Sequence, residues 1–117
     1  MNLLSELTSI IESLDIPVET GKLSDIPPDE YIVLVPIHDD YELYADDLPG
    51  ADIQSVRLSL YTKGNYIRQK NRVLKALLKA GILVIDRLYL GYEQDTGYHH
   101  YNIDAENVYG VDLGTEE

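Results

Sequence analysis

The chain has 117 residues, enough for one hydrophobic core, because two independent cores would leave each half near the lower size limit of a stable domain. Its formal charge of -12, from 21 acidic and nine basic residues, weighs against ordinary DNA or RNA binding, which needs clustered cations. Cysteine is absent, which excludes a disulfide framework and a thiolate metal site. With ten tyrosines but no phenylalanine or tryptophan, we expect polar groups at the margins of the core, since a buried tyrosine hydroxyl needs a partner.

The first residues carry neither the basic segment nor the continuous apolar run of a signal peptide. No stretch of the sequence is long and apolar enough to span a membrane. We therefore expect a chain of cytosolic origin that binds no membrane.

Charge is unevenly distributed along the chain. Residues 1–56 hold 13 acids and one base, residues 57–87 hold eight bases and one acid, and residues 88–117 hold seven acids and no base. The three blocks therefore carry -12, +7 and -7. Such segregation favours pairing between oppositely charged surfaces, either within one subunit or between neighbouring subunits.

The first predicted element is an amphipathic helix. Its apolar residues recur at the three-and-four spacing of one helical face: Leu3, Leu4, Leu7, Ile10, Ile11 and Leu14. Pro17 disfavours helical geometry at the residue before it, so the helix should end near Asp15. Residues 16–30 contain three prolines and predict a short extended piece followed by a loop.

Strands are predicted next along the chain. Residues 31–37 are rich in β-branched side chains and predict a strand, with Pro36 near its end or on a sheet edge. We expect a turn at residues 38–40, a second, shorter strand at 41–45 and a loop at 46–51. Residues 56–61 then alternate apolar and polar side chains, the pattern of a half-buried strand.

The last third of the chain predicts a helix and a hairpin. Asn65 is a good N-cap for an amphipathic helix over residues 66–80, which Gly81 closes. Residues 82–92 and 98–109 predict two strands joined by a loop at 93–97. We expect residues 1–109 to form a single domain and residues 110–117 to form a flexible acidic C-terminal tail.

The order of these elements predicts the fold class. Alternating βαβ units are absent, so a doubly wound parallel sheet is disfavoured. We expect an α+β fold with a mostly antiparallel sheet of four to six strands and two helices packed on one face.

One cluster has the residue types of a metal site, namely His99, His100 and Asp104, with His38 and its neighbouring acids as additional ligands. Adjacent residues on a strand point to opposite faces, so both histidines cannot reach one ion without a bulge. The simpler interpretation places one histidine in the sheet interface and the other in solvent. We expect neither a metal nor a cofactor.

Paired acids could in principle supply the acid and the base of glycoside hydrolysis, and the sequence has such pairs at residues 29–30, 39–40 and 46–47. In predicted loops, however, they are more simply solvated turn residues. The chain has no glycine-rich phosphate loop, no nucleophile elbow and no cysteine nucleophile. These observations predict a protein that is not an enzyme.

Cations cover the polar side of the second predicted helix, near Tyr61 and Tyr66. They could contact nucleic acid, form the solvated face of an amphipathic helix, or pair with acids of a neighbouring subunit. For the third case, the candidate subunit or partner interface consists of Arg57, Arg68, Arg72, Lys75, Asp39, Asp40, Asp46 and Asp47.

Several segments resemble one family of phage proteins. They are residues 16–21 (IPVETG), 27–31 (PPDEY) before a strand, 58–61 (LSLY) before Gly64-Asn65-Tyr66, and 91–101 (GYEQDTGYHHY), the most distinctive. Together they are similar to the small tail-terminator, or head-to-tail joining, proteins of long-tailed phages and of prophages in Gram-positive bacteria. The resemblance runs from about residue 3 to residue 109.

This resemblance implies a compact α+β subunit that forms a ring of six, caps the tail tube and docks on the head connector proteins. DNA would pass through the centre without specific binding, and an acidic lumen would repel it. Glu93 and Asp95 are candidate residues of a lumen or docking loop. The protein would be in the host cytoplasm during assembly and then in the virion, at the tail-to-head junction.

A different class of function stays open from the sequence. Small acidic phage-type domains can act as inhibitors or DNA mimics that bind a host nucleic-acid enzyme by presenting carboxylates at phosphate-like spacing. The eight clustered bases of residues 57–87 interrupt such a surface. An uncharacterised enzyme is the third alternative.

Overall fold

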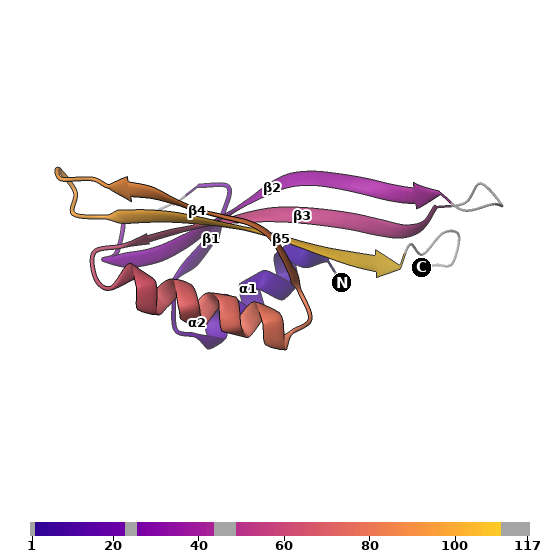
Figure 1. The fold of residues 1–117 in the computed structure, drawn as a ribbon, viewed down its shortest axis with the longest axis horizontal. Coiled ribbons are helices and arrows are strands. Elements are labelled where there is room, and N and C mark those ends of the chain that lie inside the picture. The colour runs from indigo at the N-terminus through magenta and orange to yellow at the C-terminus, as the bar shows by residue number, and fades with distance from the viewer. Residues whose placement is uncertain (1, 23–25, 44–48, 111–117) are drawn as a thin grey trace.

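A computed structural model describes residues 2–22, 26–43 and 49–110 and shows a two-layer α+β fold (Figure 1). The helices are α1 (Leu3–Ser13) and α2 (Tyr66–Lys79), and the strands are β1 (Val18–Thr20), β2 (Glu30–Leu43), β3 (Pro49–Thr62), β4 (Leu83–Tyr92) and β5 (His99–Gly110). All five strands form one sheet, and both helices lie on the same face of it. The predicted fold class is therefore confirmed.

The sheet has the strand order β1-β2-β3-β5-β4, which places β1 and β4 at opposite edges. β1 pairs with β2 in parallel, and every other neighbouring pair is antiparallel. β3 and β4 therefore run in the same direction with β5 between them. α2 is the crossover that connects β3 to β4 across one face of the sheet.

α1 is fixed by its cap and by its apolar face. The side chain of Asn2 accepts a hydrogen bond from the Ser5 amide at 2.8 Å, as an N-cap residue does. Leu3, Leu7 and Ile11 are fully buried against the sheet. After the helix, Asp15 has a φ of +61°, a left-handed conformation that aspartate tolerates at a helix end.

α2 follows the prediction closely. Asn65 caps it by accepting a hydrogen bond from the Arg68 amide at 3.1 Å. Val73 and Leu77 are fully buried. Gly81, with a φ of +77°, ends the helix in the left-handed conformation that glycine adopts without steric cost.

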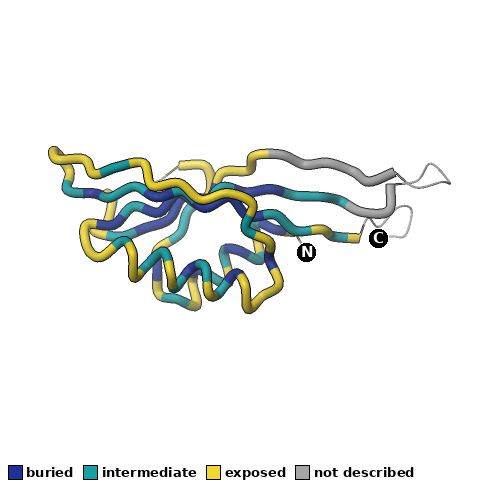
Figure 2. The backbone as a smooth tube through the Cα atoms, viewed as in Figure 1, coloured by how far each residue is buried: buried dark blue, intermediate teal, exposed yellow. Residues whose placement is uncertain are grey.

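The core lies between the helices and one face of the sheet. Alternate positions of the three central strands point into it, as shown by the cross-strand partners Leu58 and Ile103, both fully buried. Further buried core side chains are Ile16, Ile32, Leu34, Val56, Leu60, Ile82, Tyr101 and Ala105. The positions between them, such as Arg57 and its partner Asp104, face the other side. We call that side, which no described helix covers, the helix-free face (Figure 2).

The structure corrects the prediction for residues 38–51. β2 is one strand of 14 residues, not two strands separated by a turn at 38–40. A register shift between Pro36 and His38 absorbs the irregularity as a bulge at Ile37, so pairing with β3 continues through the predicted turn. β3 begins at Pro49, inside the predicted loop. Parts of the predicted strand, loop and tail, at residues 44–48 and 111–117, lie outside the described residues.

β2 and β3 extend together beyond the layer of helices, as Figure 1 shows. Their pairing continues to Leu43 and Pro49, and β5 accompanies β3 as far as Ala51. Neither described helix has the length and apolar composition that crossing a membrane would need.

Candidate assembly interface

β4 is an edge strand that carries many exposed apolar side chains. Among the described residues, twelve large apolar side chains are exposed, and six of them belong to β4: Leu83, Ile85, Leu88, Tyr89, Leu90 and Tyr92. Their exposed fractions range from 39% to 58%. An unpaired strand edge with exposed apolar side chains is a surface that readily pairs with another chain.

β4 has few of the features that usually protect a sheet edge. It is ten residues long, contains no proline and carries two charged side chains, Asp86 and Arg87. Register shifts against β5 mark irregularities at Ile85 and Leu90. Bulges can twist an edge away from a partner, but here both residues at the shifts are apolar and about half exposed. Despite these two irregularities, no described strand pairs with the outer side of β4.

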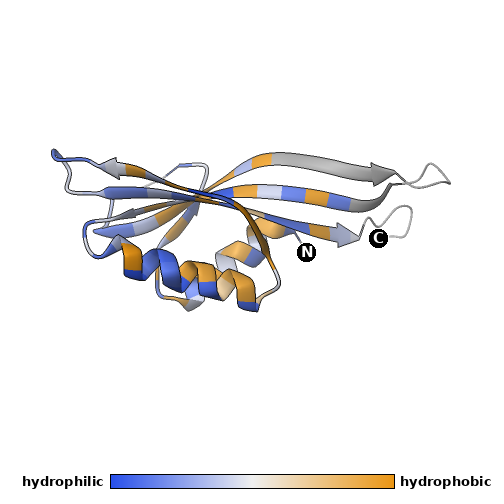
Figure 3. Ribbon diagram, viewed as in Figure 1, coloured by the Kyte–Doolittle hydropathy of each residue, from blue (hydrophilic) through white to orange (hydrophobic). Residues whose placement is uncertain are grey.

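α2 also carries exposed apolar side chains, and Figure 3 shows apolar residues along this helix. Ile67 and Leu78, which are 50% and 71% exposed, are separated by about three helical turns and so lie on one side of α2. Arg72 lies on the flank that faces α1, because its guanidinium donates to the Leu14 carbonyl at 2.8 Å. By helical periodicity Ile67 and Leu78 lie on the other flank, toward the β4 side of the sheet, where Tyr66 stacks on Tyr89.

The opposite edge of the sheet is different in kind. β1 has three residues and pairs only with Ile32–Leu34, so the rest of β2 has no described partner on that side. Val35 and Ile37, just beyond β1, are 39% and 44% exposed. The two open edges of the sheet are therefore different. One edge is β4 along its whole length, and the other is the distal half of β2.

Pro36 lies on this second edge. On the side of β2 that faces away from β3, the Ile32 amide donates to the Pro17 carbonyl at 2.9 Å, and the Leu34 carbonyl accepts from the Gly21 amide at 2.8 Å. Because a strand directs its backbone groups to alternate sides, Pro36 is the next residue whose amide would point outward. An edge position is where a sheet tolerates proline, as the sequence predicted.

Arg57 does not join the other predicted interface cations. It lies on the helix-free face, where its guanidinium donates to both carboxylate oxygens of Asp104 at 2.8 and 3.0 Å. This bidentate bond raises the pKa of the Arg57 guanidinium. Asp104 is only 8% exposed, so this ion pair is an internal part of the sheet.

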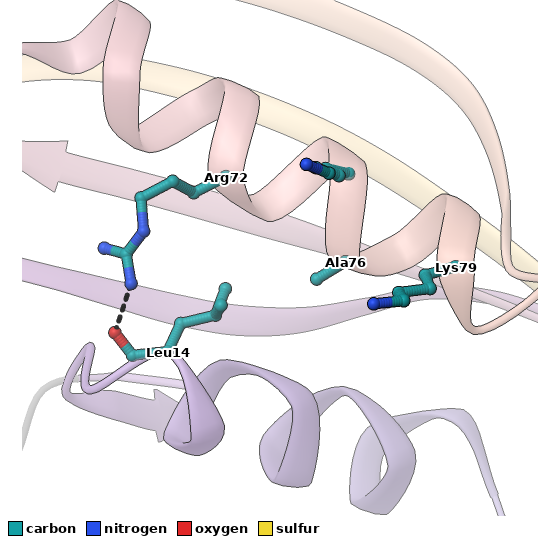
Figure 4. A pocket seen from close by; sticks show the side chains of 5 residues that line it. Leu14, Arg72, Ala76 and Lys79 are labelled. Atoms are coloured by element: carbon teal, nitrogen blue, oxygen red, sulfur yellow. Dashed lines mark hydrogen bonds between the residues drawn. The ribbon is translucent and has the colours of Figure 1, made fainter.

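The cations of α2 lie on the other side of the molecule from Arg57. Arg72 bonds Gln69 at 2.7 Å as well as the Leu14 carbonyl, so it joins α2 to the C-terminal end of α1 (Figure 4). A hollow of about 240 Å³ lies beside this contact, lined by Leu14, Arg72, Lys75, Ala76 and Lys79. Arg68 and Lys75 are exposed. The basic block of the sequence is therefore divided between two faces.

The predicted acidic partners are only partly placed. Asp39 and Asp40 are in β2, opposite Gln54 and Ile53 of β3. Asp46 and Asp47 lie outside the described residues. Of the four predicted acids, the structure therefore describes only the backbone pairing of Asp39 and Asp40.

Glu93 and Asp95 lie in the loop between β4 and β5. Glu93 accepts a hydrogen bond from the Thr96 hydroxyl at 3.0 Å, and its carbonyl accepts from the Gly97 amide at 2.7 Å. Gly97 has a φ of +82°, a conformation that favours glycine in this tight loop. An open hollow of about 480 Å³ is lined by Glu93, Gln94, Asp95 and Thr96. These acids are exposed at one end of β4, away from the α2 cations.

Sequence reasoning missed an aromatic cluster on the helix-free face. Tyr31 stacks on Tyr61 at 4.8 Å between ring centroids, and Tyr98 meets Tyr31 edge-on at 5.6 Å. Tyr61 also stacks on His100 at 4.2 Å. The alternation of residues 58–61 places Tyr61 on this face, but the partners come from strands far apart in sequence. Only the sheet topology brings them together.

The two adjacent histidines point to opposite faces, as predicted. His99 lies on the helix side, where its Nδ1 is 2.9 Å from the Tyr89 hydroxyl, and His100 stacks on Tyr61 on the helix-free face. Both are half-buried, so the prediction that one would face solvent is wrong. Burial lowers the pKa of His100, although Glu93 acts in the opposite direction. The described residues include no cluster of three or more His, Asp or Glu that could hold a metal.

Glu30, one of the paired acids of the sequence, is in a strand and not in a loop. It begins β2 opposite Thr62 of β3. Burial raises its pKa, and the charges of Arg72 and Arg68 lower it in part. Its Oε2 atom is buried without a hydrogen-bond partner. Glu30 is therefore a half-buried acid whose ionised form is mildly disfavoured, near the start of α2.

No protein-family model matches this chain, and no curated protein matches it in sequence.

Proposed function

We propose that this chain is a structural protein of a phage or prophage that forms a ring at the end of the tail tube, terminates the tail and joins it to the head connector. Two supports carry the proposal. One is the resemblance of residues 3–109 to the tail-terminator family. The other is the single structural observation that matters most: the sheet has two unlike open edges, and one of them, β4, is apolar and exposed.

Unlike edges suit a ring. A contact between identical surfaces closes at a two-fold dimer, whereas a ring requires that one surface of each subunit bind a different surface of the next. β4 and the distal half of β2 are such a pair of different surfaces on opposite sides of one sheet. The ring of six is what the resemblance implies.

The magnitude of the contact predicts conditional assembly. Burying the six half-exposed apolar side chains of β4 contributes on the order of 5 kcal/mol. Lost translational and rotational freedom costs about 4 to 15 kcal/mol on association. The β4 contact alone does not clearly exceed this cost, so we expect the ring to form on the tail tube or at high protein concentration.

The partners follow from the proposal: further copies of the chain, the tail tube protein and the head connector proteins. DNA passes through the ring without specific binding, in keeping with the net charge of -12. The protein acts in the host cytoplasm during assembly and then at the tail-to-head junction of the virion.

Tail completion tests this function. Tails assembled without their joining protein are purified, mixed with the chain and then with filled heads, and joined particles are counted by electron microscopy and by infectivity. We expect joining to require the chain and to saturate with its concentration. Failure to gain joined particles at any concentration would remove the proposal, and a stable complex with a host nuclease would favour the inhibitor instead.

A further inference from the structure

We propose that β4 of one copy pairs antiparallel with the free distal part of β2, residues 37–43, of the next copy, so that the wall of the ring is one continuous sheet. This inference rests on the proposed function and adds the contact that closes the ring. The occupant of the β4 edge is thus a second copy of this chain.

The two unpaired segments have similar lengths. β4 offers ten residues, from Leu83 to Tyr92. The open part of β2 begins after Leu34, the last residue that β1 covers, and Pro36 offers no donor. The open segment from Ile37 to Leu43 has seven residues, with the β2 bulge at its first residue. The exposed side chain of Ile37 would meet the exposed apolar side chains of β4.

The strand directions agree with the proposed pairing. Neighbours in the sheet alternate in direction from β2 to β4, so β2 and β4 run in opposite directions. Rotation about a ring axis preserves the direction of each strand relative to that axis. β2 of the next copy would therefore lie antiparallel to β4, the geometry with the more stable hydrogen bonds.

The register gives a quantitative check. Val35, Arg57, Asp104 and Asp86 are successive cross-strand partners, so without a shift Val35 of the next copy would face Asp86. Because β1 covers only Ile32–Leu34, each copy contributes four strands to the row that closes the ring: β2, β3, β5 and β4. Bringing the free part of β2 alongside β4 needs a shift of about six residues, or about 20 Å, for every four strands, which span about 19 Å. Those two lengths correspond to a strand tilt of about 46°, close to the upper end of the range of closed barrels. β1 of the next copy would then lie just past the end of β4.

The direction of this shift also determines which face of the sheet lines the lumen of the ring. Right-handed strand twist makes the strands of a closed sheet wind as right-handed helices. A connection such as β3-α2-β4, between two parallel strands of one sheet, follows a right-handed path. With that handedness, the six-residue shift makes the strands wind as right-handed helices only when α1 and α2 lie outside the ring. The helix-free face, with Arg57 and Asp104, then lines the lumen. Ile67 and Leu78 of α2 would face the neighbouring copy, because they lie on the β4 side.

Cysteine pairs test the contact cleanly because the chain has no native cysteine. The register above places Ile37 opposite Leu90, and both side chains are close to half exposed, so neither substitution should disturb the core. The double variant I37C/L90C is bound to tails lacking the joining protein, oxidised and run on a denaturing gel. We expect a ladder of covalent oligomers that ends at the closed ring.

Matched variants distinguish this contact from random collision and from other strand pairings. A mixture of the single variants I37C and L90C should give covalent dimers only, and S9C/L90C, with its first cysteine on the exposed side of α1, should give none. L88C in place of L90C tests the neighbouring register. Dimers from L90C alone would show β4 paired with β4 and would overturn the inference.

The outcomes separate this inference from the proposed function. If the wild-type chain completes tails but neither I37C/L90C nor I37C/L88C gives a ladder, the strand contact is wrong and the function stands. If the ladder forms but wild type completes no tails, the contact is right and the ring serves another function. If neither occurs, both fail.

Discussion

Arg57 and Asp104 form a bidentate ion pair in the centre of the helix-free face, at 2.8 and 3.0 Å. The sequence marked Arg57 as an interface residue because it begins the basic block. The cross-strand register explains why its partner is internal: Asp104 lies directly opposite on β5, 47 positions away. A pairing of that kind depends on strand order, which the local pattern of residues does not contain.

Replacing Arg57 by leucine should lower the free energy of unfolding by about 1 to 3 kcal/mol, because it leaves the 8%-exposed Asp104 without its charged partner. Urea unfolding measures the loss, and adding Asp104→Asn in the same chain should restore part of it. Unchanged stability of Arg57→Leu would show that the pair contributes nothing to the fold.

The protonation of Glu30 should make the stability of the protein depend on pH. Burial raises its pKa above the ordinary 4.5, so the folded state holds the proton more tightly than the unfolded state. The contribution of Glu30 to the stability of the wild type is therefore lost as the pH rises through the folded-state pKa of this group. Glu30→Gln should have a higher Tm than wild type at pH 7, and the difference should vanish below pH 4.5. A lower Tm for the variant at pH 7 would mean that Arg68 and Arg72 outweigh burial.

Among the elements, helices were easier to predict than strand ends. α2 agrees with its prediction almost to the residue, because Asn65, the apolar spacing and Gly81 are all local signals. The length of β2 was missed because acids and a histidine at 38–40 have the composition of a turn. There, pairing with β3 and a bulge at Ile37 override local preference.

The exposed cations of α2 should affect assembly more than folding. Arg72 bonds the Leu14 carbonyl within its own chain, so reversing its charge would damage the contact between helices. Arg68→Glu with Lys75→Glu avoids that problem, since both side chains are exposed. We expect this pair to slow ring formation most at low salt and to leave Tm unchanged. Equal assembly rates at low salt would exclude a charge contact through α2.

A substitution on the edge strand β4 tests assembly separately from the cations of α2. Leu88→Lys places a charge on β4, a change that protects natural sheet edges from pairing. Because Leu88 is 55% exposed, the change in unfolding free energy should stay within about 0.5 kcal/mol. Val108→Lys is a matched control, since Val108 is also 55% exposed but lies on β5 beyond the end of β4. A large loss of Tm in Leu88→Lys would make it unfit as an assembly variant.

For the whole molecule, the sequence predicted the fold class but not the surface that we now consider most informative. Net charge and charge blocks were visible in the sequence, yet folding divides the basic block between two faces. The exposure of β4 was hidden because a strand with Leu83, Ile85, Leu88 and Leu90 has the composition of a core strand. Its place at the edge follows only from the insertion of β5 between β3 and β4.

If the ring wall is the proposed sheet, the two cross-strand rows around Arg57 give its lumen a mildly acidic band. On the helix-free face, the cross-strand partners place Asp86, Asp104 and Glu106 near a single base, Arg57, among the described residues of these rows. Such a surface repels the phosphates of passing DNA without binding them. Under the proposed function, this band would suit a conduit for DNA.

The most direct measurement compares tail completion by three proteins in one assay: wild type, Leu88→Lys and Val108→Lys. Each is titrated onto tails lacking the joining protein, and head-joined particles are counted. If the ring assembles through the β4 edge, wild type and Val108→Lys should complete tails alike. Leu88→Lys, although folded, should do so at least tenfold less well, which corresponds to a loss of about 1.4 kcal/mol or more per contact. Equal completion by Leu88→Lys and wild type would contradict assembly through the β4 edge.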